Sequence, residues 1–323
     1  MKKIAVLTSG GDAPGMNACI RSVVRTSIYK GLEIIGITRG FQGMIEGNFT
    51  PLNALSVSNI IQRGGTILKS SRSPKFRTKE GRIKAAENIR KEGIEGLIVI
   101  GGDGTFTACK IFYEEHGIPS IGIPGTIDND LYGTDNTIGY DTAVNTVVEA
   151  VDKLRDTADS HDRMFIVEVM GKDAGFIALR SGIGSGAEAI LVPETTTYID
   201  ELIHKLQRGW ERQKTSSIVI VAEGDDAGGA YEVAEKVKAK FSHYEVKVSI
   251  LGHLQRGGSP SAADRILASQ LGHAAVRALI EGRKSEMIGL VNKEIIFTSF
   301  GKATKHHLQI NQELLNLADI LSI

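Results

Sequence analysis

Two carboxylates, a hydroxyl and an amide fall within the seven residues 124–130 (Pro-Gly-Thr-Ile-Asp-Asn-Asp). An apolar run at 120–123 precedes them and reads as a strand, which the proline and glycine end. The polar cluster is therefore expected at the carboxyl end of a strand, where open α/β sheets bind ligands. In an extended turn Asp128 and Asp130 could face one ligand, one near the reacting atoms and one in support. The structural alternative is an Asx turn that caps backbone amides.

Glycine-rich segments follow several apolar runs, and two of these segments are suited to phosphate. Residues 101–105 (Gly-Gly-Asp-Gly-Thr) lie between a predicted strand and a predicted helix at 105–116. Their free amides and the positive end of the helix dipole suit phosphate oxygens. Asp103 is the natural ligand for Mg²⁺, which keeps much of its water shell. A glycine loop of the same design lies earlier in the chain, at 8–15, so that 8–15 is the first glycine loop and 101–105 the second. Two such loops indicate a chain of phosphates, although the loop at 101–105 is neither a Walker A nor a G-x-G-x-x-G motif.

A basic segment at 69–79 lies between these loops, with five cations and no acid. A solvated loop is a sufficient interpretation for Lys75 and Lys79, whereas Arg72 is predicted to clamp a transferred phosphoryl group. Three more polar segments close later strands, at 170–175, 222–224 and 251–258. In the last of them His253 and Arg256 are three residues apart and are predicted to grip one anion together.

The bulk composition indicates a folded protein whose charge acts locally. Its 323 residues suffice for two domains, and 41% of them are hydrophobic. Basic and acidic residues both number 38, so no net field draws the chain to nucleic acid or a membrane. No signal peptide is expected, and no apolar run approaches the roughly 20 residues needed to span a bilayer. Cys19 and Cys109 are predicted to be reduced core thiols of a cytoplasmic protein.

Alternating strand and helix patterns predict an α/β fold with two doubly wound, mainly parallel-sheet domains, each a Rossmann-type three-layer sandwich. A helix is clearest at 141–156, where valines and a leucine follow one helical face. The predicted domains are 1–140 with about 256–300, and 141–255, followed by a helical segment at 301–323. The predicted strands are 3–8, 33–38, 96–100, 120–123, 164–169, 189–192, 217–222, 246–251 and 287–291.

Taken together, segments 101–105, 124–130, 170–175 and 252–258 resemble those of bacterial ATP-dependent 6-phosphofructokinases, and the resemblance extends over nearly the whole chain. It implies a cytoplasmic homotetramer that transfers the γ-phosphoryl group of ATP to the 1-hydroxyl of fructose 6-phosphate with the help of Mg²⁺. It identifies Asp128 as general base, with Arg72 and Thr126 as catalytic partners, and Asp103 as the Mg²⁺ ligand. The implied ATP-binding residues are Gly11, Arg72, Ser73, Gly102, Asp103, Gly104 and Thr105. The implied fructose 6-phosphate residues are Thr126, Asp128, Asp130, Met170, Gly171, Lys172, Glu223, His253 and Arg256, joined by Arg163 and Lys247 of a neighbouring subunit.

The chain departs from this family at several positions, three of which lie outside the implied effector site. Lys172 and Lys247 stand where arginine is common, and lysine lacks the planar two-pronged grip on phosphate. Phe176 stands where close relatives tend to have aspartate, a change for which there is no physical account.

Three rival functions are compatible with parts of the sequence. A pyrophosphate-dependent phosphofructokinase tends to carry Asp and Lys at the positions of Gly104 and Gly125, which here leave the α-phosphate space of ATP open. A catalytically dead sugar-phosphate sensor would be expected to lose Asp128 or Asp103, and both are present. A kinase for NAD or a lipid explains the loop at 101–105 but not the other three segments.

A second phosphate site is also predicted, from Arg21 and Arg25, which share one face of the predicted helix 15–29. A solvated basic face is the alternative. The resemblance implies an effector site for ADP or phosphoenolpyruvate between subunits, weakened by Thr215 and Ala54, where relatives carry cations. The further residues that it implies for this site are Arg155, Gly186, Glu188, Arg212 and Lys214.

Overall fold

The computed structural model describes residues 1–161, 163–212, 216–241, 245–303 and 309–322. Contacts divide the chain into two compact units. Unit 1 is Met1–Thr142 with Arg256–Leu308, and unit 2 is Ala143–Gln255 with Gln309–Ile323. The first change of unit therefore falls in the first turn of helix α5 (Tyr140–Asp159), and the residues from Gln309 onward group with unit 2.

Unit 1 contains a seven-stranded sheet in the order β11-β10-β5-β4-β1-β2-β3. The five central strands are parallel, whereas β3 and β11 run antiparallel to their neighbours at the two edges. The sequence prediction lacked both edge strands, because they are half-exposed and do not form a continuous apolar run. The strands are β1 (Lys3–Thr8), β2 (Glu33–Ile37), β3 (Phe49–Leu52), β4 (Gly96–Gly101), β5 (Ser120–Pro124), β10 (Glu286–Val291) and β11 (Glu294–Ser299).

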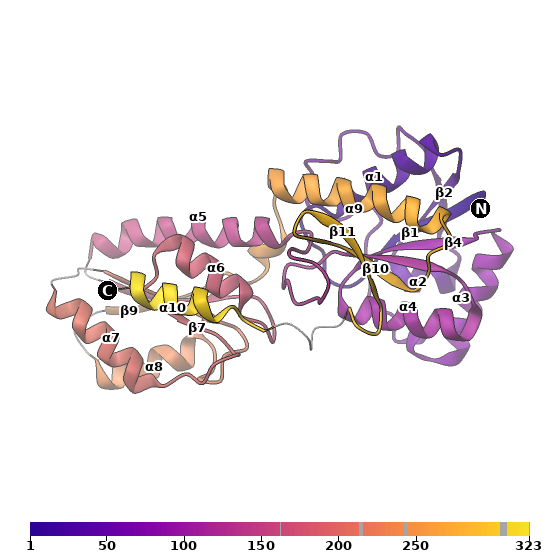
Figure 1. The fold of residues 1–323 in the computed structure, drawn as a ribbon. Coiled ribbons are helices and arrows are strands. Elements are labelled where there is room, and N and C mark those ends of the chain that lie inside the picture. Colours follow the sequence, from indigo (N-terminus) through magenta and orange to yellow (C-terminus); the bar gives the residue numbers. More distant parts are fainter. Residues whose placement is uncertain (162, 213–215, 242–244, 304–308, 323) are drawn as a thin grey trace. The chain divides into compact units, whose positions relative to one another are not determined.

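Helices cover both faces of this sheet (Figure 1). Helices α1 (Met16–Tyr29) and α9 (Ala262–Ile280) pack together on one face. On the other face lie α2 (Gly40–Glu46), α3 (Lys79–Lys91) and α4 (Asp103–His116), with the short 3₁₀ helix η1 (Lys75–Arg77). Alternate residues of β1 point to opposite faces, and residues 4–8 are all buried, as expected for the centre of a doubly wound sheet.

Unit 2 contains a parallel four-stranded sheet in the order β7-β8-β6-β9. Helices α7 (Ile199–Glu211) and α8 (Ala230–Lys240) pack on one face, and α6 (Phe176–Ser185) packs on the other with α5 beside it (Figure 1). The short 3₁₀ helix η2 (Gly252–Arg256) follows the last strand. The strands are β6 (Arg163–Val169), β7 (Ala189–Leu191), β8 (Ser217–Ala222) and β9 (Glu245–Ile250).

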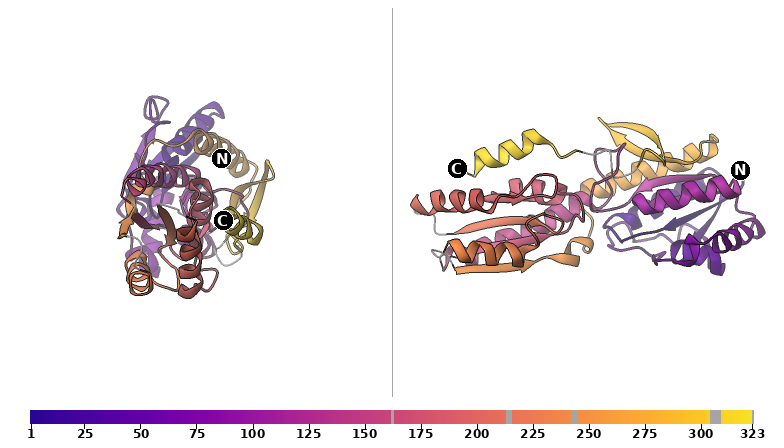
Figure 2. Two further views of the ribbon diagram at one scale, coloured as in Figure 1. Left: turned by 90° about the vertical axis from the view of Figure 1, so that its left-hand side faces the viewer. Right: turned by 90° about the horizontal axis from the view of Figure 1, so that it is seen from below.

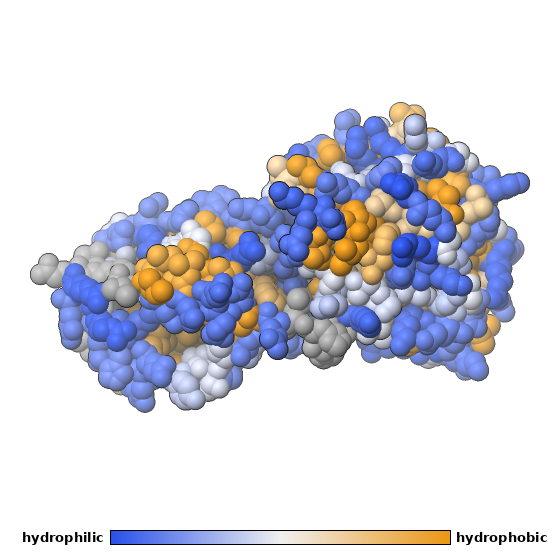
Figure 3. Space-filling model, in the orientation of Figure 1, coloured by the Kyte–Doolittle hydropathy of each residue, from blue (hydrophilic) through white to orange (hydrophobic). Residues whose placement is uncertain are grey.

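The last helix, α10 (Gln312–Leu321), lies on the surface of unit 2 against α6 and the edge strand β7 (Figure 2). None of its residues is buried, and Leu317, Ile320 and Leu321 are exposed. Figure 3 shows an apolar area on the face of unit 2 where α10 lies in Figure 1. No helix within the described ranges is long and apolar enough to cross a membrane.

The predicted fold class is confirmed, because both units are α/β with mainly parallel sheets covered on two faces. All nine predicted strands are present, each within one residue of its predicted ends. Cys19 and Cys109 lie buried in α1 and α4 as free thiols. The carboxyl ends of the parallel strands in each unit thus carry the polar segments singled out in the sequence.

Candidate active site

The two glycine loops lie side by side at the edge of the unit 1 sheet. Strands β1 and β4 are parallel neighbours, so the loops that follow them emerge together. The amide of Ser9 donates to the carbonyl oxygen of Ile100 at 2.9 Å. A Cβ atom on Gly101 would stand only 2.7 Å from the Ser9 carbonyl oxygen. Glycine at position 101 therefore permits the close approach of the two loops.

The second glycine loop is shorter than predicted, because α4 begins at Asp103 rather than at Thr105. Gly102 is its N-cap residue, and Asp103 lies in the first turn, where a carboxylate interacts favourably with the helix dipole. No heavy atom lies within 4 Å of the position that a Cβ atom of Gly104 would take. This helix start therefore presents backbone amides, one partly exposed carboxylate and open space.

The turn at 124–130 lies against this helix start. Strand β5 is parallel to β4, and the amide of Gly125 donates to the Gly101 carbonyl oxygen at 2.9 Å. A Cβ atom on Gly102 would lie 3.7 Å from Cβ of Thr126. Within the turn, the Asp128 amide donates to Oγ1 of Thr126 at 3.3 Å, and Asp128 and Asp130 are both partly buried. The structure thus brings the predicted catalytic turn and the predicted phosphate loop together.

The basic segment at 69–79 packs on the first glycine loop. The hydroxyl of Ser70 donates to the carbonyl oxygen of Gly10 at 2.8 Å. Arg72 is exposed, and it forms none of the ion pairs found among the described residues. The hydroxyl of Ser73 binds another side chain of the protein, donating to Oε1 of Gln42 at 2.7 Å. Of these two predicted ATP-binding side chains, Arg72 is the more exposed.

Arg256 lies on the first glycine loop. Its Nη1 donates to the carbonyl oxygen of Asp12 at 3.3 Å, and a Cβ atom on Gly11 would lie only 2.5 Å from the same nitrogen. Two residues predicted for different ligands, Gly11 for ATP and Arg256 for the sugar phosphate, are therefore in direct contact. His253 is exposed and belongs to unit 2, so its predicted pairing with Arg256 on one anion stays a prediction.

The loops after β6 and β8 meet at the edge of the unit 2 sheet. The Lys172 amide donates to Oε1 of Glu223 at 2.7 Å, and Lys172 has a left-handed backbone with a φ of 58°. Gly171 has a φ of 146°, and a Cβ atom there would collide with the carbonyl oxygen of Ala174. The amide of Met170 donates to Oε1 of Gln255 at 3.2 Å. The predicted sugar-binding residues Met170, Gly171, Lys172 and Glu223 are therefore brought together.

Arg163 and Lys247 lie apart from these loops, near the start of β6 and β9. Both bind the carboxylate of Glu245, Arg163 through Nε at 2.8 Å and Lys247 through Nζ at 2.6 Å. The hydrogen bonds from Lys247 and then Arg163 lower the pKa of Glu245 to about 2. With a rise of about 3.3 Å per residue, the seven residues of β6 separate this cluster from Met170 by roughly 20 Å.

Two residues of these clusters were not singled out from the sequence. Gln255 is fully buried, and its amide also donates to the Gly252 carbonyl oxygen at 3.0 Å. Glu245 links the two cations described above. Sequence signals exist for both: Gln255 lies between His253 and Arg256 in a glycine-flanked segment, and Glu245 lies two residues before Lys247, on the same face of the strand.

The predicted effector residues are distributed over both units. On α1, Arg25 is exposed and Arg21 is partly buried, and burial followed by the nearby Arg25 charge lowers the pKa of Arg21. Neither arginine belongs to the buried face of α1. Arg212 is exposed at the end of α7. Lys214 and Thr215 lie outside the described residues.

Arg155 contacts the end of α6 and two other predicted effector residues, Gly186 and Glu188. Its Nη2 donates to the carbonyl oxygens of Ser185 at 2.7 Å and Gly186 at 3.0 Å. Its Nη1 lies 3.8 Å from the buried carboxylate of Glu188. This arrangement places a cation at the negative end of a helix dipole, next to an acid.

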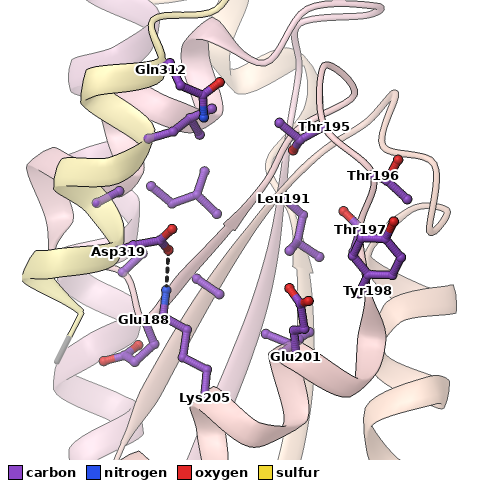
Figure 4. Close-up of a pocket in the computed structure, with 16 residues that line it drawn as sticks. Glu188, Leu191, Thr195, Thr196, Thr197, Tyr198, Glu201, Lys205, Gln312 and Asp319 are labelled. Carbon is purple, nitrogen blue, oxygen red and sulfur yellow. Dashed lines mark hydrogen bonds and ion pairs between the residues drawn. The ribbon is translucent and has the colours of Figure 1, made fainter.

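Glu188 also lines a cavity of about 260 Å³ between β7, α7 and α10 (Figure 4). The ion pair between Lys205 Nζ and Asp319 Oδ1, at 2.7 Å, crosses one side of it. A second cavity, of about 380 Å³, includes Arg212 and shares Lys205 and Asp319 with the first. Both cavities therefore adjoin predicted effector residues rather than the predicted catalytic turn. Besides Glu188, Lys205 and Asp319, the polar residues labelled around the first cavity are Thr195, Thr196, Thr197, Tyr198, Glu201 and Gln312.

Comparison with known proteins gives close relatives over the whole chain. A family model described as Phosphofructokinase matches residues 3–279. ATP-dependent 6-phosphofructokinase 2 of Bacteroides thetaiotaomicron is 54% identical over 100% of this chain and 99% of its own length. ATP-dependent 6-phosphofructokinase 1 of Thermus thermophilus is 54% identical over 100% of both chains.

Solved structures show the same fold. The phosphofructokinase from Saccharomyces cerevisiae superposes with a TM-score of 0.91 at 35% identity, covering 100% of this chain and 48% of that chain. This chain thus spans about half the length of the yeast chain. A pyrophosphate-dependent phosphofructokinase from Marinobacter aquaeolei gives a TM-score of 0.82 at 21% identity, covering 98% of this chain and 91% of that chain. This second likeness concerns the fold alone.

Proposed function

The chain belongs to the phosphofructokinase family, and we propose that it transfers the γ-phosphoryl group of ATP to the 1-hydroxyl of fructose 6-phosphate, giving fructose 1,6-bisphosphate and ADP. The curated relatives that are 54% identical to it are named ATP-dependent 6-phosphofructokinases. Within the chain itself, the observation that carries the choice of donor is the geometry around two glycines.

Gly104 and Gly125 favour ATP over pyrophosphate. The space beside Gly104 is open, so a nucleotide meets no side chain there. A Cβ atom on Gly125 would lie 2.8 Å from Cγ2 of Ile100 and 3.2 Å from Cε of Met16. Lysine at position 125, as expected for a pyrophosphate-dependent enzyme, would thus require the buried residues around it to repack.

Asp128 is proposed as the general base that accepts the proton of the attacking 1-hydroxyl. Phosphoryl transfer needs little covalent help, so catalysis rests on positioning and on stabilisation of the developing charge. Arg72, exposed at the first glycine loop, is suited to the equatorial oxygens of the transferred group. Thr126 holds the turn, because its hydroxyl accepts a hydrogen bond from the Asp128 amide.

The donor set fits Mg²⁺ bound mainly through ATP. Among the residues that the structure describes, no group of three His, Cys, Asp or Glu side chains could hold a metal by itself. Mg²⁺ commonly uses one carboxylate together with waters and phosphate oxygens, and Asp103 at the start of α4 supplies such a carboxylate. When bound, the ion would neutralise charge on the phosphate chain, while the amides of the glycine loops orient it.

Fructose 6-phosphate is proposed to bind at the loops of unit 2. Glu223 accepts one hydrogen bond from Lys172, and a carboxylate has further lone pairs for sugar hydroxyls. Arg163 and Lys247 are separated from these loops within one chain, so we assign them to the 6-phosphate bound by a neighbouring subunit of a homotetramer. In that role both cations exchange the carboxylate of Glu245 for the phosphate.

Regulation by ADP and phosphoenolpyruvate is proposed for the effector residues. Arg21 and Arg25 offer two cations that the core does not need, and Arg155 offers a third beside the end of α6. Because Thr215 and Ala54 bring no charge, we expect a modest effect: a sigmoidal fructose 6-phosphate curve that phosphoenolpyruvate shifts and ADP restores.

A coupled assay of the purified chain tests the proposed function. Fructose 6-phosphate is supplied with ATP and Mg²⁺ in one series and with pyrophosphate and Mg²⁺ in a second. Turnover with ATP alone is the expected result. Turnover with pyrophosphate at a similar kcat/KM would refute the donor argument from Gly104 and Gly125. Absence of turnover with either donor would refute the proposed reaction.

A further inference from the structure

Asp264 is a buried carboxylate that binds the start of a different helix. It lies in the first turn of α9 and is only 1% exposed. Its Oδ1 accepts from the Gly139 amide at 2.8 Å, and its Oδ2 accepts from the Thr142 amide at 2.8 Å and from the Thr142 hydroxyl. Two amides at the beginning of α5 that lack a partner within that helix are therefore satisfied by Asp264.

The residues just before Gly139 hold the catalytic turn. The hydroxyl of Thr137 donates to the Thr126 carbonyl oxygen at 2.6 Å, and its amide donates to Oδ1 of Asn129 at 2.7 Å. The amide of Ile138 donates to the carbonyl oxygen of Pro124 at 2.9 Å. Three hydrogen bonds from two consecutive residues thus attach segment 137–138 to the turn that carries Asp128.

Gly139 itself lies in a tight space between the catalytic turn and the first glycine loop. A Cβ atom there would lie 2.7 Å from Cβ of Ala13 and 3.3 Å from Cγ2 of Ile127. On the other side of the same loop, a Cβ atom on Gly15 would lie 3.6 Å from Cβ of Asp264. A shift of the Gly139 backbone would therefore be transmitted to both the turn and the loop, since neither leaves it room.

We propose that Asp264 is a positioning residue for phosphoryl transfer: by holding Gly139 and Thr142, it fixes segment 137–142 and, through that segment, the catalytic turn. This inference rests on the proposed function of the turn. It does not require Asp264 to touch a substrate. The effect should appear in the chemical step, because misplacement of a reacting group by about 1 Å can cost on the order of 10²-fold in rate.

The substitution Asp264→Asn tests this role with little change in shape. Whichever way the new amide is turned, its NH₂ group faces the backbone N–H of either Gly139 or Thr142, and one hydrogen bond is lost. We expect kcat at saturating ATP and fructose 6-phosphate to fall about 10- to 100-fold. Both KM values should change by less than about threefold, because the variant replaces none of the side chains proposed to bind ATP or fructose 6-phosphate.

A matched control is Asp141→Asn in the same network. Asp141 accepts from the Ser261 hydroxyl at 2.6 Å, and an asparagine oxygen can still accept that bond. The kcat of Asp141→Asn should stay within about twofold of wild type. If Asp264 had only a structural role, the kcat of Asp264→Asn would also stay within about twofold of wild type, and the inference would be wrong.

A second pair of variants decides the matter if Asp264→Asn does not fold. Thr142→Val removes the hydroxyl that donates to Asp264, and Thr142→Ser restores it. We expect a lower kcat in the valine variant and recovery in the serine variant. Equal kcat values in both would overturn the inference alone, provided that the wild-type chain phosphorylates fructose 6-phosphate. A wild-type chain without that activity would overturn the proposed function and this inference together.

Discussion

The contact between Gly11 and Arg256 leads to a prediction about Gly11→Ala. A Cβ atom at position 11 would lie 2.5 Å from Nη1 and 3.0 Å from Cζ of Arg256. Because ordinary contacts begin near 3.4 Å, the guanidinium has to move by about 1 Å, the difference between 3.4 Å and 2.5 Å. Its hydrogen bond to the Asp12 carbonyl oxygen, at 3.3 Å already long, would then be lost.

The size of the effect follows from that one hydrogen bond. A hydrogen bond that involves a charged group contributes about 1.5–3 kcal/mol, and Arg256 is only partly buried, which favours the lower value. About 1.5 kcal/mol corresponds to roughly tenfold. We therefore expect kcat/KM for fructose 6-phosphate to fall about tenfold in Gly11→Ala, because the hydrogen bond to Asp12 no longer holds the guanidinium at the place where it is proposed to bind the sugar phosphate.

Steady-state kinetics of a double-mutant cycle measure this effect. Wild type, Gly11→Ala, Arg256→Ala and the double variant are compared with fructose 6-phosphate varied at saturating ATP. If Gly11 acts through Arg256, adding Gly11→Ala to Arg256→Ala should change kcat/KM by less than about twofold. Gly301→Ala is the matched control, since it adds the same methyl group at an exposed position outside the candidate site, at an ordinary contact distance of 3.6 Å from Nζ of Lys110. Fully additive effects, or an equal loss in the control, would refute the reasoning.

Four further predictions concern single substitutions. Asp128→Asn should lower kcat by about 10²–10⁴ with little change in KM, and a near-wild-type kcat would contradict its role as general base. Gly104→Asp should raise the KM for ATP steeply by filling the open space beside the loop, and an unchanged KM would place the nucleotide elsewhere. Lys247→Arg should lower the KM for fructose 6-phosphate about fivefold, or of order 1 kcal/mol, because a guanidinium can donate two parallel hydrogen bonds to a phosphate and an ammonium cannot. An unchanged or higher KM would count against the assignment of residue 247 to the 6-phosphate. Arg21→Ala should abolish the response to phosphoenolpyruvate and ADP while kcat at saturating substrate stays the same. The contrary outcome concerns the wild type: hyperbolic kinetics, together with no calorimetric binding of ADP when the catalytic site is blocked, would mean that no effector site is functional.

The central strands could be predicted from the sequence because burial on both faces leaves a simple pattern. Strand β4 (Gly96–Gly101) is buried at every residue, and its sequence is a continuous apolar run. The edge strands have no such pattern. Strand β3 (Phe49–Leu52) contains a proline and two exposed residues, and its pairing with β2 depends on a neighbour that the local sequence does not reveal.

The start of α4 shows how tertiary structure overrides local preference. Gly102 and Gly104 disfavour helix, so the sequence indicates a start at Thr105. The observed helix begins at Asp103, with the Phe106 amide donating to the Gly102 carbonyl oxygen at 3.2 Å. Phe106 is fully buried and stacks on Phe300, with ring centroids 5.4 Å apart. Burial of this ring can offset the cost of a glycine in the first turn.

The sequence predicts those parts of the candidate site that directly follow the parallel strands. Parallel strands bring the segments that follow them to one edge, and this explains why the loops at 8–15, 101–105 and 124–130 meet. Contacts that join these loops to distant segments have no such signal. Arg256 reaches the first loop across 244 residues, to Asp12, and nothing in the spacing of either residue indicates the pairing.

Asp264 shows that a local capping pattern can coincide with a long-range role that the pattern does not indicate. Ser261 and Asp264 have the three-residue spacing of a capping motif, and the Ser261 hydroxyl indeed accepts from the Asp264 amide at 3.2 Å. The return half of that motif is absent, because the Ser261 amide donates instead to the Thr142 hydroxyl at 2.9 Å. The Asp264 carboxylate is thereby left for Gly139, 125 residues away in sequence. The capping motif at 261–264 thus begins α9 and also binds the start of α5. Its local sequence indicates only the first of these two functions.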